Sequence, residues 1–523
     1  MAKAEKNGAG KGADHRYPLR CAAVDIGSNA IRFCAAEFTA PGTYTVLESI
    51  RSPVRLGHGV FLKGRLVAAA MNAACEALAD FAARMKGLRV QRHRVVATSA
   101  VRESANGEAF IRRIQSETGL KLEVITGSEE ARLVYLAVKR RIPMGSKPWL
   151  LVDLGGGSVE VTVADGDGVL STESHTMGAV RLLEDLAQNA DEPGRFAQIL
   201  EEYVGTLRAP SQLSAQVPAG YAATGGNIEA LADLALGGPG PDGVSTLKVS
   251  DLERIIRQLA RMSYRERIEV LGLREDRADV ILPAAVVYHR LAQLAHADAI
   301  VVPRVGIKEG VLLDLDGGDV GRHDRGSALD VERAALALGR KYAFDEAHGL
   351  HVAELALSLF GQLRELHGMG GFEERILCSA AILHDIGGFV SFSRHHKHSL
   401  YLIANSSLGG LSPREVMMVA NVARYHRRSA PKPTHEAFQA MDKEAREVVV
   451  KLASLLRLAD AMDREHRQRV HGVRAAVRRG KAVLRLSGDG DLLLEGWALK
   501  RKSDLFEKCF GLKIQVVGTG GTS

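Results

Sequence analysis

Two segments of the sequence place an aspartate and a glycine turn directly after an apolar run. Asp25 opens the first segment and Asp153 opens the second. The small residues that follow them are Gly27, Ser28, Asn29, Gly155, Gly156, Gly157 and Ser158. Backbone N–H groups of such turns bind phosphate oxygens, and a neighbouring carboxylate is a ligand for Mg²⁺. One turn alone is equally typical of a tight hairpin, but two in matching contexts favour a phosphate site.

A third glycine cluster, Thr224, Gly225 and Gly226, follows another apolar run and precedes a helical pattern. Because a helix N-terminus favours anions, we expect this cluster to complete the phosphate pocket. The later turn that contains Gly306 and Gly310 is expected to be structural.

The segments that must position these turns alternate β-rich runs with helical patterns, which indicates an α/β fold. The residues around Asp153 repeat the order strand, glycine loop, strand seen around Asp25, so we expect an internal duplication. Further along the chain, long apolar periodicity of helical type replaces this order, and strand patterns return near Val470. The expected units are a disordered basic tail at 1–19, lobe I at 20–138, lobe II at 139–317, a helical domain at 326–468 and a small strand-rich α+β segment at 469–523.

The composition limits the class of protein. The chain has 523 residues, a net charge of +7 and 46% hydrophobic residues, which is typical of a soluble globular protein with several domains. Its five scattered cysteines form no CxxC pair, which favours a reducing cytoplasm. No apolar run approaches the roughly 20 residues of a membrane span, so no membrane partner is expected. The positive charge favours a polyanionic partner, and no specific nucleic acid is expected.

Several motifs in a fixed order carry a resemblance to a known family. They are AAVDIGSNAIR, VVATSAVRESANG, EVITGSEEARLVYLAV, LLVDLGGGSVEVTV and AATGGN, across about residues 20 to 315. This series resembles the exopolyphosphatase and guanosine pentaphosphate phosphohydrolase family, within the superfamily of actin and the sugar kinases. The resemblance implies a duplicated actin-like (ribonuclease H-like) fold of two lobes that bind phosphate between them.

The same resemblance implies roles for particular residues. Glu130 would be the general base that activates the attacking water, and Arg102 would hold phosphate. Asp153, Glu160 and Asp25 would bind Mg²⁺. Without the flanking motifs, Glu129 and Glu130 would be read as acids that stabilise the first turn of a helix.

The helical domain carries a second group of metal-ligand residue types, in the order His, His-Asp, Asp. This order resembles the HD phosphohydrolase superfamily, and nitrogen with oxygen ligands suits a divalent transition metal or Mg²⁺. The candidate ligands are His348, His384, Asp385, His398, His426 and Asp460, with His395 and His396 beside them. A single buried histidine such as His351 is usually a core residue, but the full set favours a metal site. Catalysis, nucleotide binding, dimerisation and extension of a basic channel for the polymer all remain open for this domain.

The expected activity is release of terminal orthophosphate from inorganic polyphosphate. Removal of the 5′ γ-phosphate of guanosine pentaphosphate is the close alternative, and a small-molecule kinase or a non-catalytic polyphosphate or nucleotide sensor are the remaining ones. A basic run would favour a long polyanion, although it is also typical of a solvated face. Its members are Arg467, Arg469, Arg474, Arg478 and Arg479. A homodimer is one arrangement that the sequence leaves open.

Overall fold

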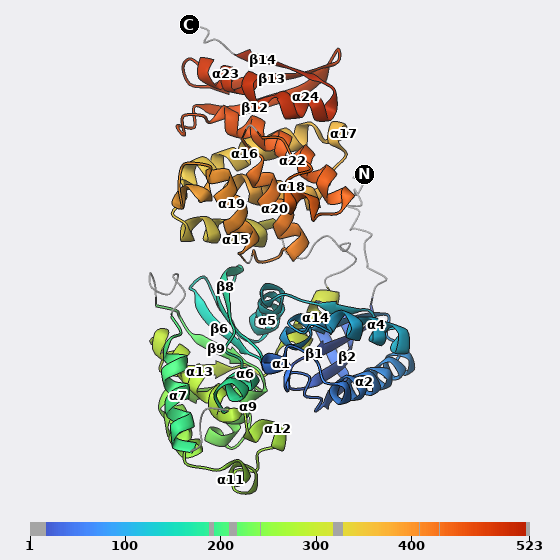
Figure 1. Cartoon of the computed structure of the whole chain (residues 1–523), viewed down its shortest axis with the longest axis vertical. Helices are drawn as coiled ribbons and strands as arrows, with labels where there is room; N and C mark the ends of the chain where they lie inside the picture. Colours follow the sequence, from blue (N-terminus) through green and yellow to red (C-terminus); the bar gives the residue numbers. More distant parts are fainter. Residues whose placement is uncertain are drawn as a thin grey trace, which may run out of the picture.

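The computed structural model describes residues 17–187, 193–208, 217–240, 242–316, 328–406, 408–427 and 429–518. Two α/β lobes lie at one end of the molecule, a helical part lies beyond them, and a small sheet forms the far end (Figure 1). Most of the expected tail and the expected boundary between lobe II and the helical domain, from residue 317 to 326, lie outside the described residues. In the described part of the chain, no helix is both long and apolar enough to cross a membrane.

Lobe I is a five-stranded sheet in the order β3-β2-β1-β4-β5. Its strands are β1 (Leu19–Ile26), β2 (Ile31–Ala40), β3 (Thr43–Ser52), β4 (Arg92–Ala97) and β5 (Leu122–Val124). Its helices are α1 (Val60–Lys63), α2 (Ala68–Gly87), α3 (Ser99–Arg102), α4 (Gly107–Thr118) and α5 (Gly127–Arg141). The strands β1 to β3 form an antiparallel meander, and β4 and β5 continue the sheet parallel to β1.

Lobe II is a six-stranded sheet in the order β10-β11-β9-β6-β7-β8. Its strands are β6 (Trp149–Leu154), β7 (Val159–Ala164), β8 (Val169–His175), β9 (Tyr221–Thr224), β10 (Ser245–Lys248) and β11 (Ala299–Val302). The helices are α6 (Ala179–Ala187), α7 (Pro193–Gly205), α9 (Gly226–Leu236), α10 (Val249–Leu259), α11 (Tyr264–Glu269), α12 (Glu275–Ala278), α13 (Ile281–Leu294) and α14 (Ile307–Asp316).

Five strands of each sheet share one topology, an antiparallel meander extended by strands parallel to its first member, and lobe II adds β10 as an antiparallel edge strand. The register of the two first hairpins also matches. Asp25 pairs with Arg32 across β1 and β2, and Asp153 pairs with Glu160 across β6 and β7. The repeated glycine-loop pattern therefore marks a duplicated structural unit, in which equivalent positions hold an arginine in lobe I and a glutamate in lobe II.

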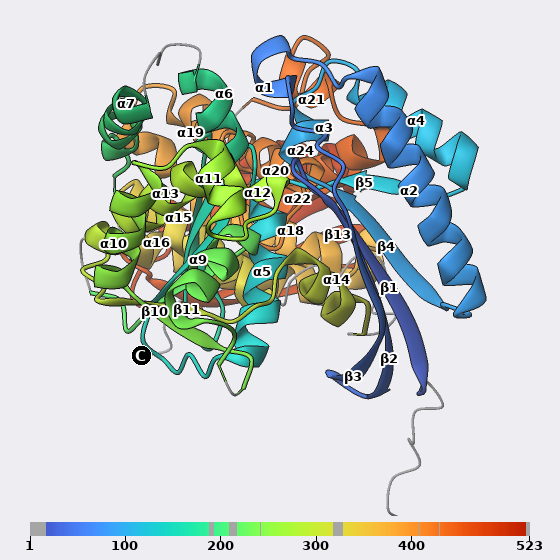
Figure 2. The ribbon, with the colours of Figure 1, turned by 90° about the horizontal axis from the view of Figure 1, so that it is seen from below.

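Helices α5 and α14 lie between the two groups of strands (Figure 2). One buried apolar cluster joins both helices to both sheets, with Ala23, Leu133, Leu151 and Val311 among its members. Although α14 follows the last strand of lobe II, it packs on α5 and on β1 of lobe I. These two helices therefore connect the lobes.

The helical part contains a second large apolar core. Its elements are α15 (Ala328–Lys341), α16 (Glu346–Gln362), α17 (Arg364–His367), α18 (Gly371–Leu383), η1 (Ile386–Phe389), α19 (His395–Ala404), α20 (Pro413–Arg424), α21 (Glu436–Gln439) and α22 (Lys443–Met462). The C-terminal elements are β12 (Val470–Arg478), β13 (Lys481–Gly488), α23 (Leu493–Lys502), α24 (Asp504–Phe510) and β14 (Lys513–Gly518). Leu484 and Phe506 belong to the same core cluster as Leu359 and Leu456, so the C-terminal sheet and the helices fold around one core.

Gly310 lies where α14 crosses α5 at close range. A Cβ at Gly310 would lie 2.0 Å from the carbonyl oxygen of Leu133 on α5. We expect Gly310→Ala to push the two helices apart and to lower the free energy of unfolding by about 2 to 3 kcal/mol, the cost of overpacking. Gly87→Ala is the control, because a Cβ there has no atom within 4 Å. Thermal melts should show a lower Tm for Gly310→Ala only, and equal melts would contradict the close crossing.

Candidate functional site

The glycine turns of both lobes and the third glycine cluster meet at one cleft. Two adjoining cavities, of about 630 Å³ and about 70 Å³, share the lining residues Asp25, Asp153, Gly225 and Gly226. The smaller cavity is also lined by Gly27, Ser28, Asn29, Glu130, Gly155 and Gly156. The structure thus brings together residues that lie far apart in the sequence.

The glycine turns of the two lobes approach one another closely because Gly156 and Gly157 have no side chains. A Cβ at Gly156 would lie 2.7 Å from Cβ of Ser28, and a Cβ at Gly157 would lie 2.5 Å from Oγ of Ser99. The hydroxyls of Ser28 and Ser99 are themselves 3.1 Å apart. Glycine is therefore required in the second turn for the hairpin of lobe II to pack against lobe I.

Four acids surround this junction, each with a defined partner. Arg32 Nη1 donates to Asp25 Oδ2 at 3.0 Å, and Thr224 Oγ1 donates to Asp153 Oδ1 at 2.6 Å. The other two acids accept hydrogen bonds from side chains of other elements. Ser174 Oγ donates to Glu160 Oε1 at 2.9 Å, and Arg102 Nη1 donates to Glu130 Oε1 at 2.7 Å.

Burial makes these acids hard to ionise. Desolvation raises the pKa of Asp25, Asp153 and Glu130, and it raises the pKa of Glu160 to about 7. The acids also repel one another, since Glu160 raises the pKa of Glu130 and Asp153 raises that of Glu160. A bound cation would relieve this repulsion.

The cleft fits a hard divalent cation such as Mg²⁺. Oδ1 of Asp25 and Oε2 of Glu160 are buried and have no hydrogen-bond partner among the described residues. Carboxylate oxygens are the ligands that Mg²⁺ prefers. We propose that Asp25, Asp153 and Glu160 hold the ion.

Glu129 and Glu130 are neighbours on α5 with opposite electrostatic environments. Glu129 accepts hydrogen bonds from Arg94 at 2.9 Å and from Arg132 at 2.8 Å. Both arginines also pair with Asp314 of α14. The Arg132 and Arg94 guanidiniums overcome burial and lower the pKa of Glu129 to about 2. Glu129 therefore serves the contact between α5 and α14, while Glu130 faces the cleft.

Several residues expected to bind phosphate have protein partners in the structure. Thr224 orients Asp153, and Arg102 donates to Glu130 and to the carbonyl of Ile125. Asn29 Nδ2 donates to the carbonyl oxygen of Asp276 at 2.9 Å. The carbonyl of Gly156 accepts from amides at the start of α6. Phosphate binding by these residues remains a prediction.

A group of cationic residues in the cleft was missed by the sequence analysis. The larger cavity is lined by Arg32, Arg51, Arg274, Arg277, Arg304 and Lys308. Arg277 is buried, and burial together with Arg32 lowers its pKa to about 10. Guanidiniums crowded in this way favour a bound anion. Arg32 lies inside the AAVDIGSNAIR motif and could have been found there, whereas the residues around Arg277 carry no motif.

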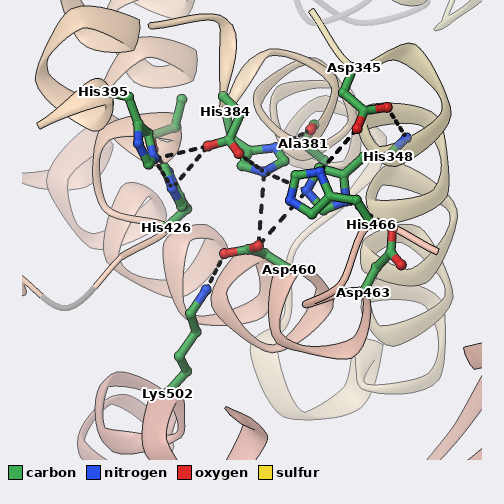
Figure 3. A network of polar contacts seen from close by, with 12 residues as sticks. Asp345, His348, Ala381, His384, His395, His426, Asp460, Asp463, His466 and Lys502 are labelled. Carbon is green, nitrogen blue, oxygen red and sulfur yellow. Dashed lines mark hydrogen bonds and ion pairs between the residues drawn. The ribbon is translucent and has the colours of Figure 1, made fainter. Parts of the chain in front are cut away.

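The second group of candidate ligands gathers among the helices of the helical part (Figure 3). His348, His384 and Asp460 form one cluster, and Asp385, His395 and His426 form another. His395, at the start of α19, is in the second cluster, while His398 is in neither of the clusters found among the described residues. A further group joins His348 and Asp385 to His466, which the sequence analysis did not single out.

The two duplicated lobes around an acidic cleft define an actin-like α/β protein. The model of the Ppx/GppA phosphatase family matches residues 37–317, and that of Ppx/GppA phosphatase domain III matches residues 331–505. The chain belongs to the Ppx/GppA phosphatase family. Members of this family are phosphatases that hydrolyse phosphoanhydride substrates.

Individual relatives carry two different names. A guanosine-5′-triphosphate,3′-diphosphate pyrophosphatase from Photobacterium profundum is 27% identical over 467 residues, which cover 86% of this chain and 88% of that protein. The crystal structure of an exopolyphosphatase from Cytophaga hutchinsonii has a TM-score of 0.54 and 27% identity, covering 58% of this chain and all of that one. A family member from Aquifex aeolicus, also 27% identical, covers 57% of this chain and 97% of its own, with a TM-score of 0.48.

Replacing Glu129 or Glu130 by glutamine should have different effects on the free energy of unfolding. The pKa of Glu129 is lowered in the folded state, so its stabilising effect is present above pH 4.5 and is lost as pH falls toward about 2. The pKa of Glu130 is raised, so its ionisation costs stability as pH rises above 4.5. At pH 8 without metal, Glu129→Gln should lower the free energy of unfolding by about 2 to 4 kcal/mol, and Glu130→Gln should leave it equal or higher. Chemical denaturation measures both values, and a destabilised Glu130→Gln would contradict this assignment.

Proposed function

We propose that the chain releases terminal orthophosphate from inorganic polyphosphate, with Glu130 as the general base. The observation that carries this proposal is the position of Glu130, a buried carboxylate that lines the smaller cavity beside Asp25 and Asp153. Its raised pKa makes it a stronger base than an exposed glutamate once it is ionised. Arg102 holds one of its oxygens, which leaves the other to accept a proton.

The reaction needs one water molecule and one base. Water attacks the terminal phosphorus, the bond from that phosphorus to the bridging oxygen breaks, and Glu130 takes the proton of the water. Mg²⁺, when bound, neutralises the negative charge that develops on the phosphate oxygens. Asp153 is held in one orientation by Thr224, so its ligand oxygens are fixed before substrate arrives.

The cations of the larger cavity support a polyphosphate chain as substrate. Each phosphate unit carries negative charge, and Arg51, Arg277 and Lys308 line the space next to the acids. Arginine forks bind phosphate oxygens in pairs. Successive phosphate units would therefore meet successive cations along the cleft. The basic strand β12, by contrast, lies at the far end of the molecule in Figure 1, where only a long chain would reach it.

Guanosine pentaphosphate is the second candidate substrate. Apolar side chains line part of the same cavity and offer a surface for a purine ring, namely those of Ala230, Leu234, Leu271 and Leu273. The name of the Photobacterium relative also points to this nucleotide. Both substrates would use the same chemistry at Glu130.

Glu130→Gln tests the base directly. The amide keeps the size of the side chain and its contact with Arg102 but accepts no proton. We expect phosphate release from polyphosphate to fall by at least about 10²-fold, with polyphosphate binding nearly unchanged. Assays with long polyphosphate, guanosine pentaphosphate and ATP, in parallel and with Mg²⁺, should show polyphosphate as the preferred substrate of the unaltered protein. Normal turnover by Glu130→Gln would remove it from the mechanism, and preference for the nucleotide would select the second candidate.

Asp153→Asn tests the metal ligands. A neutral amide is a poorer ligand for a hard cation, so the Mg²⁺ concentration for half-maximal phosphate release should rise at least about tenfold, or activity should be lost. Asp251→Asn is the control, because Asp251 lies on the surface helix α10 and pairs with Arg254. An Asp153→Asn protein with an unaltered Mg²⁺ titration would place the ion elsewhere.

A further inference from the structure

The small sheet formed by β12, β13 and β14 has two faces that differ in chemistry. Successive side chains of a strand point to opposite faces of a sheet. Val473, Leu484 and Leu486 are buried in the core that this sheet shares with the helices, so their face of the sheet points inward. Arg474 and Arg485 alternate with them and are exposed. The face that contains these arginines is therefore the outer face.

Cations form two rows across the strands on the outer face. The first row is the cross-strand pair of Arg474 and Arg485. The second row is Arg478, Lys481 and Lys513, which are paired in register across all three strands. Four residues separate the two rows along β12 and along β13, which corresponds to about 13 Å. The outer face thus presents positive charge along two lines.

Little on this face neutralises the charge of the two rows. The four cations of β12 and β13 form no ion pair with any of the described residues, whereas Lys513 pairs with Glu507 at 2.8 Å. Like charges directly opposite each other destabilise a sheet, so an anionic partner would remove a cost that the free protein carries. The remaining residues of the outer face are neutral, namely Gly472, Ala476, Val483, Ser487, Gln515 and Val517.

The hairpin turn between β12 and β13 adds a cation in an unfavourable backbone conformation. Arg478 pairs with Lys481, so the turn consists of Arg479 and Gly480. Their φ angles are 47° and 71°, and two-residue turns with positive φ at both positions favour Asn-Gly. An arginine in the left-handed region is strained. The turn therefore carries a charge that its backbone does not favour, at the end of the second row.

We propose that the outer face of the C-terminal sheet binds the phosphate backbones of a double-stranded nucleic acid without reading its sequence. Each row of cations meets one phosphate strand, because the major groove of B-DNA is about 12 Å wide and the rows are about 13 Å apart. Contacts from arginine and lysine to phosphate supply affinity but carry no sequence information. The residues that contact phosphate are Arg474, Arg478, Arg479, Lys481 and Arg485.

The composition of the outer face favours a duplex over other polyanions. Single strands are commonly held by stacking of their bases on aromatic side chains, and the described residues of this face include none. A polyphosphate chain is a single line of phosphates and would follow one row at a time. Peripheral membrane binding also relies on apolar anchors, whereas Val483 and Val517 are partly buried.

The outer face is remote from the cleft between the lobes. In Figure 1 the C-terminal sheet lies at the opposite end of the molecule from the two α/β lobes, with the helical part between them. A duplex on the sheet therefore leaves the cleft accessible, and the proposal does not depend on the chemistry at Glu130.

Salt-dependent binding tests the contact. The full-length chain is titrated, without Mg²⁺, into short labelled DNA duplexes of two unrelated sequences, and binding is measured by fluorescence anisotropy. Both should bind equally, with a Kd of about 1 to 100 µM near physiological salt. A plot of log binding constant against log salt concentration should have a slope of about −4.5, the value for five phosphate contacts.

The double change Arg478→Gln with Lys481→Gln locates the contact on the outer face. It removes two phosphate contacts, so the slope should become about −2.7 and the affinity should fall. Lys500→Gln with Lys508→Gln is the control, because it removes the same charge from exposed positions on α23 and α24. The control should bind like the unaltered chain. Absence of binding to either duplex, or equal binding by Arg478→Gln with Lys481→Gln, would overturn the proposal.

Arg479→Asn separates binding from folding. Asparagine suits the turn better than arginine, so the Tm should stay equal or rise while the slope becomes less steep by about 0.9. A lower Tm together with unchanged duplex binding would show that this cation serves the fold and would remove it from the contact. Single-stranded DNA, polyphosphate and phosphatidylglycerol vesicles are titrated in parallel. If any of them binds as tightly as the duplex and loses affinity in Arg478→Gln with Lys481→Gln, the duplex is the wrong partner.

Discussion

Carboxyl groups buried at the junction of the two lobes impose an electrostatic cost that the rest of the fold must offset. Asp25, Glu130 and Glu160 are buried there beside Asp153, and Arg32 and Arg102 are the guanidiniums bonded directly to them. Uncompensated carboxylates in such a place oppose folding. The surrounding structure offsets this cost with apolar contacts, as in the core cluster that joins both sheets to α5 and α14. The same cost makes the site receptive to a cation.

The first turn of α5 shows how the protein separates stability from chemistry. Glu129 lies in a network with Arg94, Arg132 and Asp314 that ties α5 to α14. One residue further, Glu130 turns toward the cleft, and its pKa moves in the opposite direction. A helix anchored by one acid therefore fixes the position of the next, so the general base we propose has little freedom to move.

Elements with a local sequence pattern were predicted from the sequence. Site residues whose position depends on tertiary packing were missed. Strand, glycine loop and strand recur around Asp25 and Asp153, so the actin-like duplicated fold was correctly predicted and is confirmed by the family match. Arg277 reaches the cleft from the short helix α12, and no spacing rule connects it to the glycine turns. His395 and His398 lie on the same side of α19, about 4.5 Å apart along its axis, and only the packing of that helix decides which of them meets His426. The HD-type assignment of the helical part remains a prediction.

The matched hairpins have one further consequence. Two identical copies of a unit would present the same groups on both sides of the junction. The arginine at position 32 and the glutamate at position 160 occupy equivalent places in the two hairpins but differ in chemistry. Arg32 lines the cavity that also contains Arg51 and Arg277, whereas Glu160 lies beside Asp153 and Glu130. One change between the copies thus gives a single junction both a residue type that suits anions and a residue type that suits cations.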